Sequence, residues 1–187
     1  KTSSVVAVKV NALPTATVTA NGPTTFCSGT NPLTLVANAG AGLSYQWLKG
    51  TTVLAGATSQ NYVPTVTSTL YKVQVTDSNG CSKTSSAVAV KVNALPTATI
   101  TAGGPTTFCA GDSVKLQANT GTGLTYQWIK GTTPISGSVA SLYTAKTAGT
   151  YKVQVTNSNG CSRTSSGKAV TINCRLAVDT QDNGSLS

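Results

Sequence analysis

The sequence of 187 residues contains no histidine, glutamate or methionine, and its acidic side chains are four aspartates. General acid–base catalysis depends mainly on His, Glu and Asp, and a nucleophilic Ser or Thr needs an activating base. A calcium site requires several converging carboxylates, which four scattered aspartates do not supply. We therefore expect no enzyme activity, no bound metal and no cofactor.

Long apolar runs and clustered charges are also missing. No stretch approaches the roughly 20 apolar residues of a membrane span, so the chain is predicted not to cross a bilayer. The net charge is +9, but the 13 Lys and Arg residues are dispersed and no three are consecutive. Nucleic-acid binding favours basic clusters interleaved with aromatic residues, and we expect no nucleic-acid partner. A mildly basic surface suits an acidic polysaccharide better.

The chain is instead dominated by internal repeats. The segment NALPTATVTANGPTTFCSG at 11–29 returns at 93–111 with three changes, and YKVQVTDSNGCSKTSS at 71–86 returns at 151–166 with two. A period of about 80 residues indicates tandem domains that each fold mostly on themselves. Function then belongs to the array rather than to one pocket, and the neighbouring repeats are the first expected partners.

These repeats predict the domain boundaries. Residues 11–92 form one repeat and residues 93–172 a second. Residues 1–10 match 83–92 at nine of ten positions, which identifies them as the last strand of a preceding repeat. Residues 173–187 are expected to be a divergent tail.

Apolar and polar residues alternate with a period of two, as in YKVQV at 71–75, and Asn-Gly pairs mark tight turns. About seven short strands in each repeat, with one Trp in an early strand, predict an immunoglobulin-type sandwich of two sheets. The fold class is therefore all-β, with tandem immunoglobulin-like sandwiches in an extended array. The residues expected in the structural core are Trp47, Tyr71, Trp128 and Tyr151.

Four cysteines recur at equivalent places, Cys27 and Cys81 in the first repeat and Cys109 and Cys161 in the second. This recurrence predicts one disulfide in each repeat, Cys27–Cys81 and Cys109–Cys161, and an oxidising compartment. A standard sandwich topology places these positions towards opposite ends, however. Either the first strand runs unusually or the pairing differs, because bridged Cα atoms lie within about 7 Å. Cys174 breaks the pattern.

The combination of PTTFCSG, YQW and YKVQVTDSNGCS resembles the immunoglobulin-like or PKD-like repeats of very large secreted surface proteins of Bacteroidota. These include gliding-motility adhesins and other cargo of type IX secretion. The resemblance covers residues 1–172 and implies export, attachment to the cell surface and an extended rod. It provides no catalytic residues. Asp112-Ser113-Val114 also resembles the short O-glycan acceptor of that group, so Ser113 is a candidate for glycosylation.

We interpret the chain as a stalk or filament region of a secreted bacterial cell-surface adhesin that projects or spaces a binding tip. The short junction 91–99 contains Pro96, which resists folding back. Two alternatives remain open: the repeats themselves bind polysaccharide or a surface protein, or they are an accessory region of a surface polysaccharide-degrading enzyme. Ligand binding would need exposed aromatic rings, and the recurring candidates are Tyr45, Tyr126, Tyr62 and Tyr143.

Overall fold

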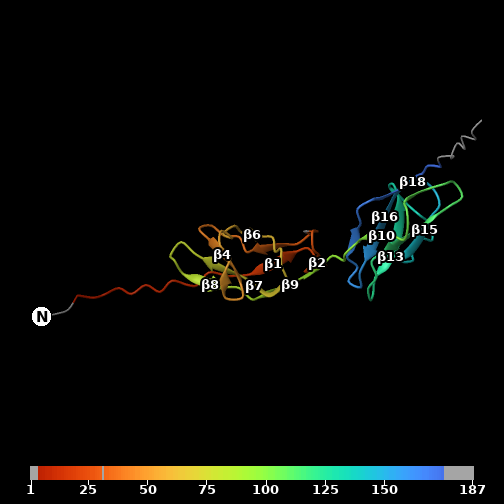
Figure 1. Cartoon of the computed structure of the whole chain (residues 1–187). Coiled ribbons are helices and arrows are strands. Elements are labelled where there is room, and N and C mark those ends of the chain that lie inside the picture. The colour runs from red at the N-terminus through yellow and green to blue at the C-terminus, as the bar shows by residue number, and fades with distance from the viewer. Residues whose placement is uncertain (1–3, 31, 175–187) are drawn as a thin grey trace, which may run out of the picture. The chain divides into compact units, whose positions relative to one another are not determined.

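The computed structural model describes residues 4–30 and 32–174 and divides the chain into two compact units (Figure 1). Unit 1 is Lys1–Ala94 and unit 2 is Leu95–Ser187. The described residues form strands and turns and contain no helix. The described part of the chain therefore has no helix with the length and hydrophobicity that a bilayer crossing requires.

Unit 1 is built from two sheets. The first has the order β1–β3–β6 and contains β1 (Val18–Asn21), β3 (Thr34–Ala37) and β6 (Asn61–Tyr62). The second has the order β2–β9–β7–β4–β5 and contains β2 (Thr25–Cys27), β9 (Val88–Asn93), β7 (Ser68–Thr76), β4 (Ser44–Lys49) and β5 (Thr52–Val53). β8 (Ser82–Thr84) also pairs with β7.

Unit 2 repeats this topology strand for strand. Its first sheet has the order β10–β12–β15 and contains β10 (Ile100–Ala102), β12 (Val114–Ala118) and β15 (Leu142–Ala145). Its second sheet has the order β11–β18–β16–β13–β14 and contains β11 (Thr107–Phe108), β18 (Lys168–Ile172), β16 (Gly149–Thr156), β13 (Thr125–Lys130) and β14 (Thr133–Pro134). β17 (Ser162–Thr164) also pairs with β16.

The core of each unit lies between its two sheets. Alternate residues of the central strands point inward, as the burial pattern of β12 shows, because successive side chains of a strand face opposite ways. Trp47 and Trp128 have no exposed surface. Each indole N–H finds a carbonyl acceptor, at 2.9 Å on Ser59 and at 2.9 Å on Ala140. The two tryptophans thus occupy equivalent positions, and the indole N–H of each has a hydrogen-bond acceptor.

Tyr71 and Tyr151 are also fully buried. The Tyr71 hydroxyl donates to the Val66 carbonyl at 2.9 Å, and the Tyr151 hydroxyl donates to the Thr147 carbonyl at 2.8 Å. Both hydrogen bonds reach backwards along the chain to the loop that precedes the strand. This is the arrangement of a tyrosine corner in a sandwich of immunoglobulin type.

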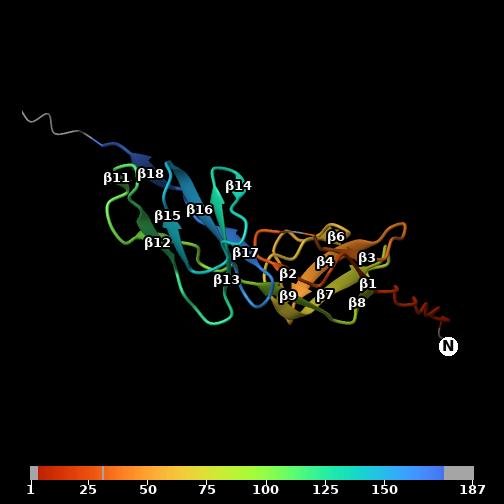
Figure 2. The ribbon, with the colours of Figure 1, turned by 90° about the vertical axis from the view of Figure 1, so that its right-hand side faces the viewer.

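In each unit one strand pair is parallel, whereas the other paired strands are antiparallel. In unit 1, β2 lies along β9, with Phe26 opposite Val92 and Cys27 opposite Asn93. In unit 2, β11 lies along β18, as Figure 2 shows, with Phe108 opposite Ile172. Each FC motif therefore sits beside the last residues of its own unit.

The chain enters and leaves each sandwich at opposite ends. In unit 1 the segment before β1 contacts the β3–β4 loop, where the Thr17 amide donates to Asn38 Oδ1 at 2.9 Å. That loop lies at the end where β4 begins opposite Thr76. The last strand, β9, runs antiparallel to β7 and ends at the other end, beside Cys27. We call these the N-terminal end and the C-terminal end of a unit.

Residues 4–17 contain no regular secondary structure. The valines of this segment are almost fully exposed, from 80% at Val6 to 97% at Val5. The same residues in β9 are packed, since Val90, the counterpart of Val8, is only 2% exposed. The assignment of residues 1–10 to a preceding repeat therefore stays a prediction.

Candidate functional site

The cysteines at the C-terminal end of unit 2 correct the predicted disulfides. Cys109, which follows β11, is bonded to Cys174, which follows β18, with 4.6 Å between their Cα atoms. The predicted Cys109–Cys161 bond is therefore wrong. The predicted Cys27–Cys81 bond is also wrong, because Cys81 is a free, half-exposed thiol.

The physical reason is the length of the sandwich. Cys161 lies in the turn after β16, at the N-terminal end of unit 2, whereas Cys109 lies at the C-terminal end. β16 spans eight residues between these ends, which at about 3.3 Å per residue is more than 20 Å. Disulfide-bonded Cα atoms lie within about 7 Å. The same separation along β7 excludes the bond predicted within unit 1.

The position of Cys174 explains why it seemed to break the repeat. Its counterpart in unit 1 is Ala94, which directly follows β9. The parallel pairing with β11 brings residue 174 beside Cys109, and the Asn173 amide donates to the Phe108 carbonyl at 3.0 Å. Unit 2 thus has a third cysteine, Cys174, where unit 1 has Ala94.

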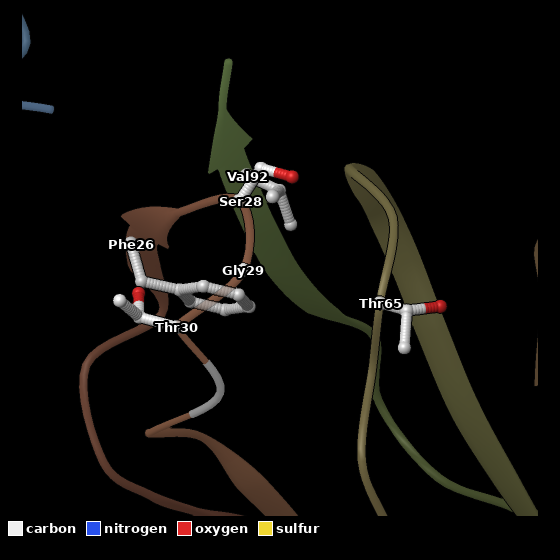
Figure 3. A pocket seen from close by; sticks show the side chains of 6 residues that line it. All are labelled: Phe26, Ser28, Gly29, Thr30, Thr65 and Val92. Atoms are coloured by element: carbon white, nitrogen blue, oxygen red, sulfur yellow. The ribbon is translucent and has the colours of Figure 1, made fainter. Parts of the chain in front are cut away.

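A recess of about 270 Å³ lies at the corresponding end of unit 1 (Figure 3). It is lined by Phe26, Ser28, Gly29, Thr30, Thr65 and Val92. Figure 3 shows the Phe26 ring on one side and Thr65 on the other. The recess holds hydroxyl groups but no charged side chain, so it offers no acid, base or metal ligand.

A larger and more open groove, of about 580 Å³, lies on unit 2 along the β13–β14 turn and the start of β16. It is lined by Lys130, Gly131, Thr133, Pro134, Ile135, Gly149 and Thr150. In unit 1 the counterpart of Thr150 is Leu70, whose Cδ1 would lie 3.7 Å from a Cβ on Gly50. The smaller side chain at residue 150 thus leaves space in unit 2 that leucine covers in unit 1.

Lys130 is the one charged residue of this groove. Its ammonium group donates to Thr147 Oγ1 at 2.8 Å and lies 5.8 Å from the centre of the Tyr151 ring. A Cβ at Gly149 would come within 2.5 Å of Lys130 Cε, so a side chain at this position would displace the lysine, and the φ of +154° favours glycine there. The lysine is therefore held in place over the buried tyrosine.

The tyrosines predicted as possible ligand contacts have structural partners. The Tyr45 hydroxyl donates to the Asn38 carbonyl at 2.9 Å, and the Tyr126 hydroxyl donates to the Asn119 carbonyl at 3.0 Å. Each bond spans seven residues and ties a strand to the loop before it. Both rings are half-buried, so neither presents a fully exposed aromatic face on which a sugar ring could stack.

Tyr62 and Tyr143 lie within aromatic stacks. The Tyr62 ring centre is 5.5 Å from Trp47 and 5.7 Å from Tyr71. Tyr143 is placed in the same way, 5.4 Å from Trp128 and 5.5 Å from Tyr151. Burial raises the pKa of the Tyr62 and Tyr143 phenols above the usual value. The stacks extend the core to the edge of each first sheet.

The structure also gives a role to Asp77, which the repeat replaces with Asn157. Asp77 Oδ1 accepts hydrogen bonds from the amides of Asn79 and Cys81, both at 2.9 Å. Asn157 Oδ1 accepts from Asn159 and Cys161 at 3.1 and 3.0 Å. The turn needs a side-chain oxygen as hydrogen-bond acceptor, and either Asp or Asn supplies one. The negative charge of a carboxylate is not needed for this contact.

Sequence reasoning missed two buried serines. The Oγ of Ser85 accepts a hydrogen bond from the Val73 amide at 3.1 Å and donates to the Ser86 carbonyl at 2.8 Å. Ser165 does the same in unit 2, accepting from the Val153 amide at 3.0 Å. The recurring TSS sequence was the available signal, because serine is not usually a buried residue.

The remaining predicted site residue, Ser113, is exposed on the turn before β12. Among the residues that the structure describes, no three His, Cys, Asp or Glu side chains are close enough together to hold a metal ion.

In comparisons with known protein families, the two units match two different family models. Residues 96–174 match the family described as "Ig-like domain CHU_C associated". Residues 16–94 match a family described as "Domain of unknown function (DUF8696)". A search of curated proteins finds no match to this chain.

Several solved structures are similar to the chain. Murine CEACAM1b has a TM-score of 0.39 at 19% identity, over 85% of this chain and 100% of that one. Fibronectin(III)-like modules of Clostridium thermocellum CbhA have 0.39 at 13%, over 83% and 92%. Extracellular domains 3–5 of Drosophila OTK have 0.43 at 16%, over 87% and 63%. At these scores the likenesses carry no argument about function.

The strand order and the family match of residues 96–174 confirm the predicted fold class. The chain is all-β and consists of two immunoglobulin-like sandwiches in tandem. Its disulfide-bonded cysteines, Cys27, Cys109, Cys161 and Cys174, indicate an oxidising compartment outside the cytoplasm.

Proposed function

We propose that the chain is a spacer region of a secreted bacterial surface protein, in which tandem sandwiches hold a binding region away from the cell. The observation that carries this proposal is the passage of the chain through each sandwich from one end to the other. A unit of this kind adds its own length to the distance between the segments that precede and follow it. The extended array predicted from the sequence is part of this proposal.

The interior of each unit supports a passive role. The large aromatic side chains are committed to the core, and the phenols that could have faced a ligand are hydrogen-bonded to loop carbonyls. No described side chain with buried polar atoms lacks a hydrogen-bond partner. Such a domain is suited to persistence rather than to catalysis, and we propose no enzyme activity for it.

The finer assignment follows from the resemblance of the repeats. On that basis the protein is a cell-surface adhesin of a Bacteroidota species, exported by type IX secretion, and its adhesive tip lies outside residues 11–172. Surface polysaccharides or other cell-surface proteins are the partners of that tip.

The first experiment replaces residues 11–172, in the whole protein on its own cells, with an unrelated pair of tandem sandwiches of the same length. A spacer tolerates this exchange, so adhesion should be retained, whereas deletion of the same residues should reduce it. Loss of adhesion in the exchanged protein, at normal surface abundance, would contradict the proposal.

A second candidate function is binding of an acidic polysaccharide by unit 2. It is favoured by the groove around Lys130 together with the net charge of +9. Thr and Gly line the same groove, so hydroxyl groups and backbone are available to a sugar.

This candidate is tested by titrating the purified chain with alginate and with a neutral glucan at physiological salt. Saturable binding of alginate that Thr150→Leu abolishes would establish the second function, because leucine fills the groove as in unit 1. A binding signal that salt removes, and that Thr150→Leu leaves unchanged, would leave only the spacer.

A further inference from the structure

Cys81 is a free thiol at a turn where unit 2 has a disulfide-bonded cysteine. It lies between β7 and β8, and Cys161 occupies the same place between β16 and β17. Cys161 is disulfide-bonded, whereas Cys81 is free and half-exposed. We call these two the turn cysteines, and Cys27 and Cys109 the FC cysteines. The turn cysteines share one position in the fold and differ in their bonding.

The two turns have the same hydrogen bonds. The Cys81 carbonyl accepts from the Asp77 amide at 3.0 Å, and the Cys81 amide donates to Asp77 Oδ1 at 2.9 Å. Both corresponding distances between Cys161 and Asn157 are 3.0 Å. The flanking strands pair over three residues in the same register in both units. The backbone thus holds Cys81 in the conformation in which its counterpart is bonded.

A turn cysteine and the FC cysteine of the same unit are not bonded to each other. Cys161 is not the partner of Cys109, because Cys109 is bonded to Cys174. In unit 1, Cys27 is disulfide-bonded although Cys81 is free. Both kinds of cysteine therefore form disulfides, and a partner for Cys81 has to come from outside its own unit.

Cys81 lies at the N-terminal end of unit 1, where the chain enters. A Cβ at Gly42, in the β3–β4 loop, would lie 3.4 Å from Ser78 Cβ in the Cys81 turn. The same loop holds Asn38, which accepts a hydrogen bond from the Thr17 amide. The free thiol therefore belongs to the end of unit 1 to which the preceding part of the chain is attached.

The repeats predict where an FC cysteine of a preceding repeat would lie. In unit 1, Cys27 is paired with Asn93, at the end of β9. Residues 1–11 repeat residues 83–93 with one change, so Asn11 is the counterpart of Asn93. An FC cysteine in the repeat to which residues 1–10 are assigned would therefore lie beside Asn11.

The chain keeps that position close to unit 1. Asn11 precedes Thr17 by six residues, which span at most about 22 Å when fully extended. Thr17 is fixed to the N-terminal end of unit 1 by its hydrogen bond to Asn38. The FC cysteine of a preceding repeat and Cys81 are thus brought to one junction.

We propose that Cys81 forms a disulfide with the FC cysteine of the preceding repeat, so that a covalent bond closes this junction in addition to the chain itself. The inference rests on the proposed spacer function, because it needs a repeat before unit 1. A junction held by the chain and by a disulfide bends less than one held by the chain alone, which suits a spacer.

Formation of this bond is an oxidation of two thiols. The Cys81 thiolate attacks a sulfur of an oxidant, a protein disulfide or low-molecular-weight disulfide, and releases one thiolate of that oxidant. The thiolate of the FC cysteine then attacks the Cys81 sulfur of the mixed disulfide and releases the other. Each cysteine loses its proton, and the two electrons pass to the oxidant, which becomes two thiols.

The first part of the test measures whether the Cys81 thiol is accessible in the folded 187-residue chain. Ellman's reagent should react with this chain, and the reaction should be lost in Cys81→Ser. A folded chain that does not react would overturn the proposal, because the bond requires an accessible thiol.

The second part examines the whole protein on its own cells. Free thiols are blocked with N-ethylmaleimide before lysis, and the protein is digested with trypsin without reduction. Cys81 is the one cysteine of the tryptic peptide 73–83. This peptide should be found linked to a peptide that carries an FC cysteine from before residue 1, and its maleimide-labelled form should be lost.

Two variants of the whole protein identify the bond. Ser78→Ala, at an exposed position of the same turn, is the matched control: it keeps the disulfide and changes the mass of the linked peptide. Cys81→Ser should remove the linked peptide and leave the FC cysteine of the preceding repeat labelled by maleimide.

The proposal is overturned if Cys81 is labelled by maleimide in the whole protein, or if no cysteine precedes residue 1. It is equally overturned if the linked partner is a small thiol or a cysteine of a second copy of the protein. The exchange experiment on cells measures adhesion and not disulfides, so failure of the spacer function and failure of this bond are distinguishable.

Discussion

Units 1 and 2 have the same strand order, the same parallel pair and the same buried aromatic residues, yet they differ at their ends and edges. Trp47 and Trp128 are equally buried, and both use the indole N–H in the same way. The turn after the long central strand keeps its hydrogen bonds although Asp77 is exchanged for Asn157. What the two units share is therefore the set of contacts that defines the sandwich.

The differences lie outside that set. Residue 174 is a cysteine where unit 1 has Ala94, and Thr150 opens a groove that Leu70 covers in unit 1. Neither change touches the core between the sheets. The comparison teaches that properties specific to one unit, such as a covalent tie or a groove, are added at positions on which the fold does not depend.

The largest expected effect tests whether the two cores are independent. Trp47→Ala should lower the free energy of unfolding of unit 1 by about 3–5 kcal/mol, because it leaves a large cavity. Hydrogen exchange measured by mass spectrometry should show lost protection in peptides of unit 1 and unchanged protection in unit 2. Trp128→Ala should give the reverse pattern. Equal loss in both units would show that they unfold as one block.

The next effect concerns the disulfide that unit 1 cannot copy. Cys174→Ser should destabilise unit 2 by up to about 4 kcal/mol, because the open loop regains conformational entropy in the unfolded state. Chemical denaturation under oxidising conditions measures this change. Cys81→Ser is the control, since Cys81 is a free thiol, and should change stability by less than about 0.5 kcal/mol. Equal stability of the Cys174→Ser and Cys81→Ser variants would contradict a stabilising role of the Cys109–Cys174 disulfide.

A smaller effect is expected from the buried serines, where the units are alike. Ser165→Ala leaves the Val153 amide without its side-chain acceptor and should cost about 1–3 kcal/mol. Thermal unfolding should show a lower Tm for unit 2, and Ser85→Ala should lower that of unit 1 by a similar amount. Ser166→Ala, at an exposed neighbouring position, is the matched control and should leave Tm unchanged.

The smallest effect is expected from exchanging the turn residues between units. Asp77→Asn and Asn157→Asp should each change stability by less than about 0.5 kcal/mol, because both residues present Oδ1 to the same two amides. Replacement of either residue by Ala should cost about 1 kcal/mol, since two hydrogen bonds lose their acceptor. Equilibrium denaturation of the four variants provides the test. If the Asp–Asn exchanges lowered the free energy of unfolding as much as the Ala variants do, the charge of the side chain would matter at this turn.

The fold could be predicted from local patterns because those patterns report on the core. Alternation in segments such as 71–75 marks which face of a strand is buried, and Trp47 and Tyr71 occupy places that an immunoglobulin-type sandwich makes recognisable. The exchange of Asp77 for Asn157 was visible in the repeat, but the two amides that need its oxygen were not.

The disulfides could not be predicted from recurrence alone. Cys161 and Cys109 recur together, yet a pairing depends on which end of the sandwich each residue reaches. The direction of the short strand β11, which runs parallel to β18, decides this, and two residues are too few to reveal such a pairing in sequence. The alignment of Cys174 with Ala94 identified an odd residue without identifying its partner.

The exposed segment 4–10 has a consequence for the order in which the chain folds. It carries the same valine pattern as β9, yet it leaves the ribosome about 80 residues earlier. Domains fold as they emerge, at about 5–20 residues per second. β9 follows β7 by about 15 residues, so for about 1–3 s β7 can meet the early copy of the strand before its own partner is made. The native product requires β9 to take that place when it appears, so translation speed and chaperone occupancy help to decide which copy pairs with β7.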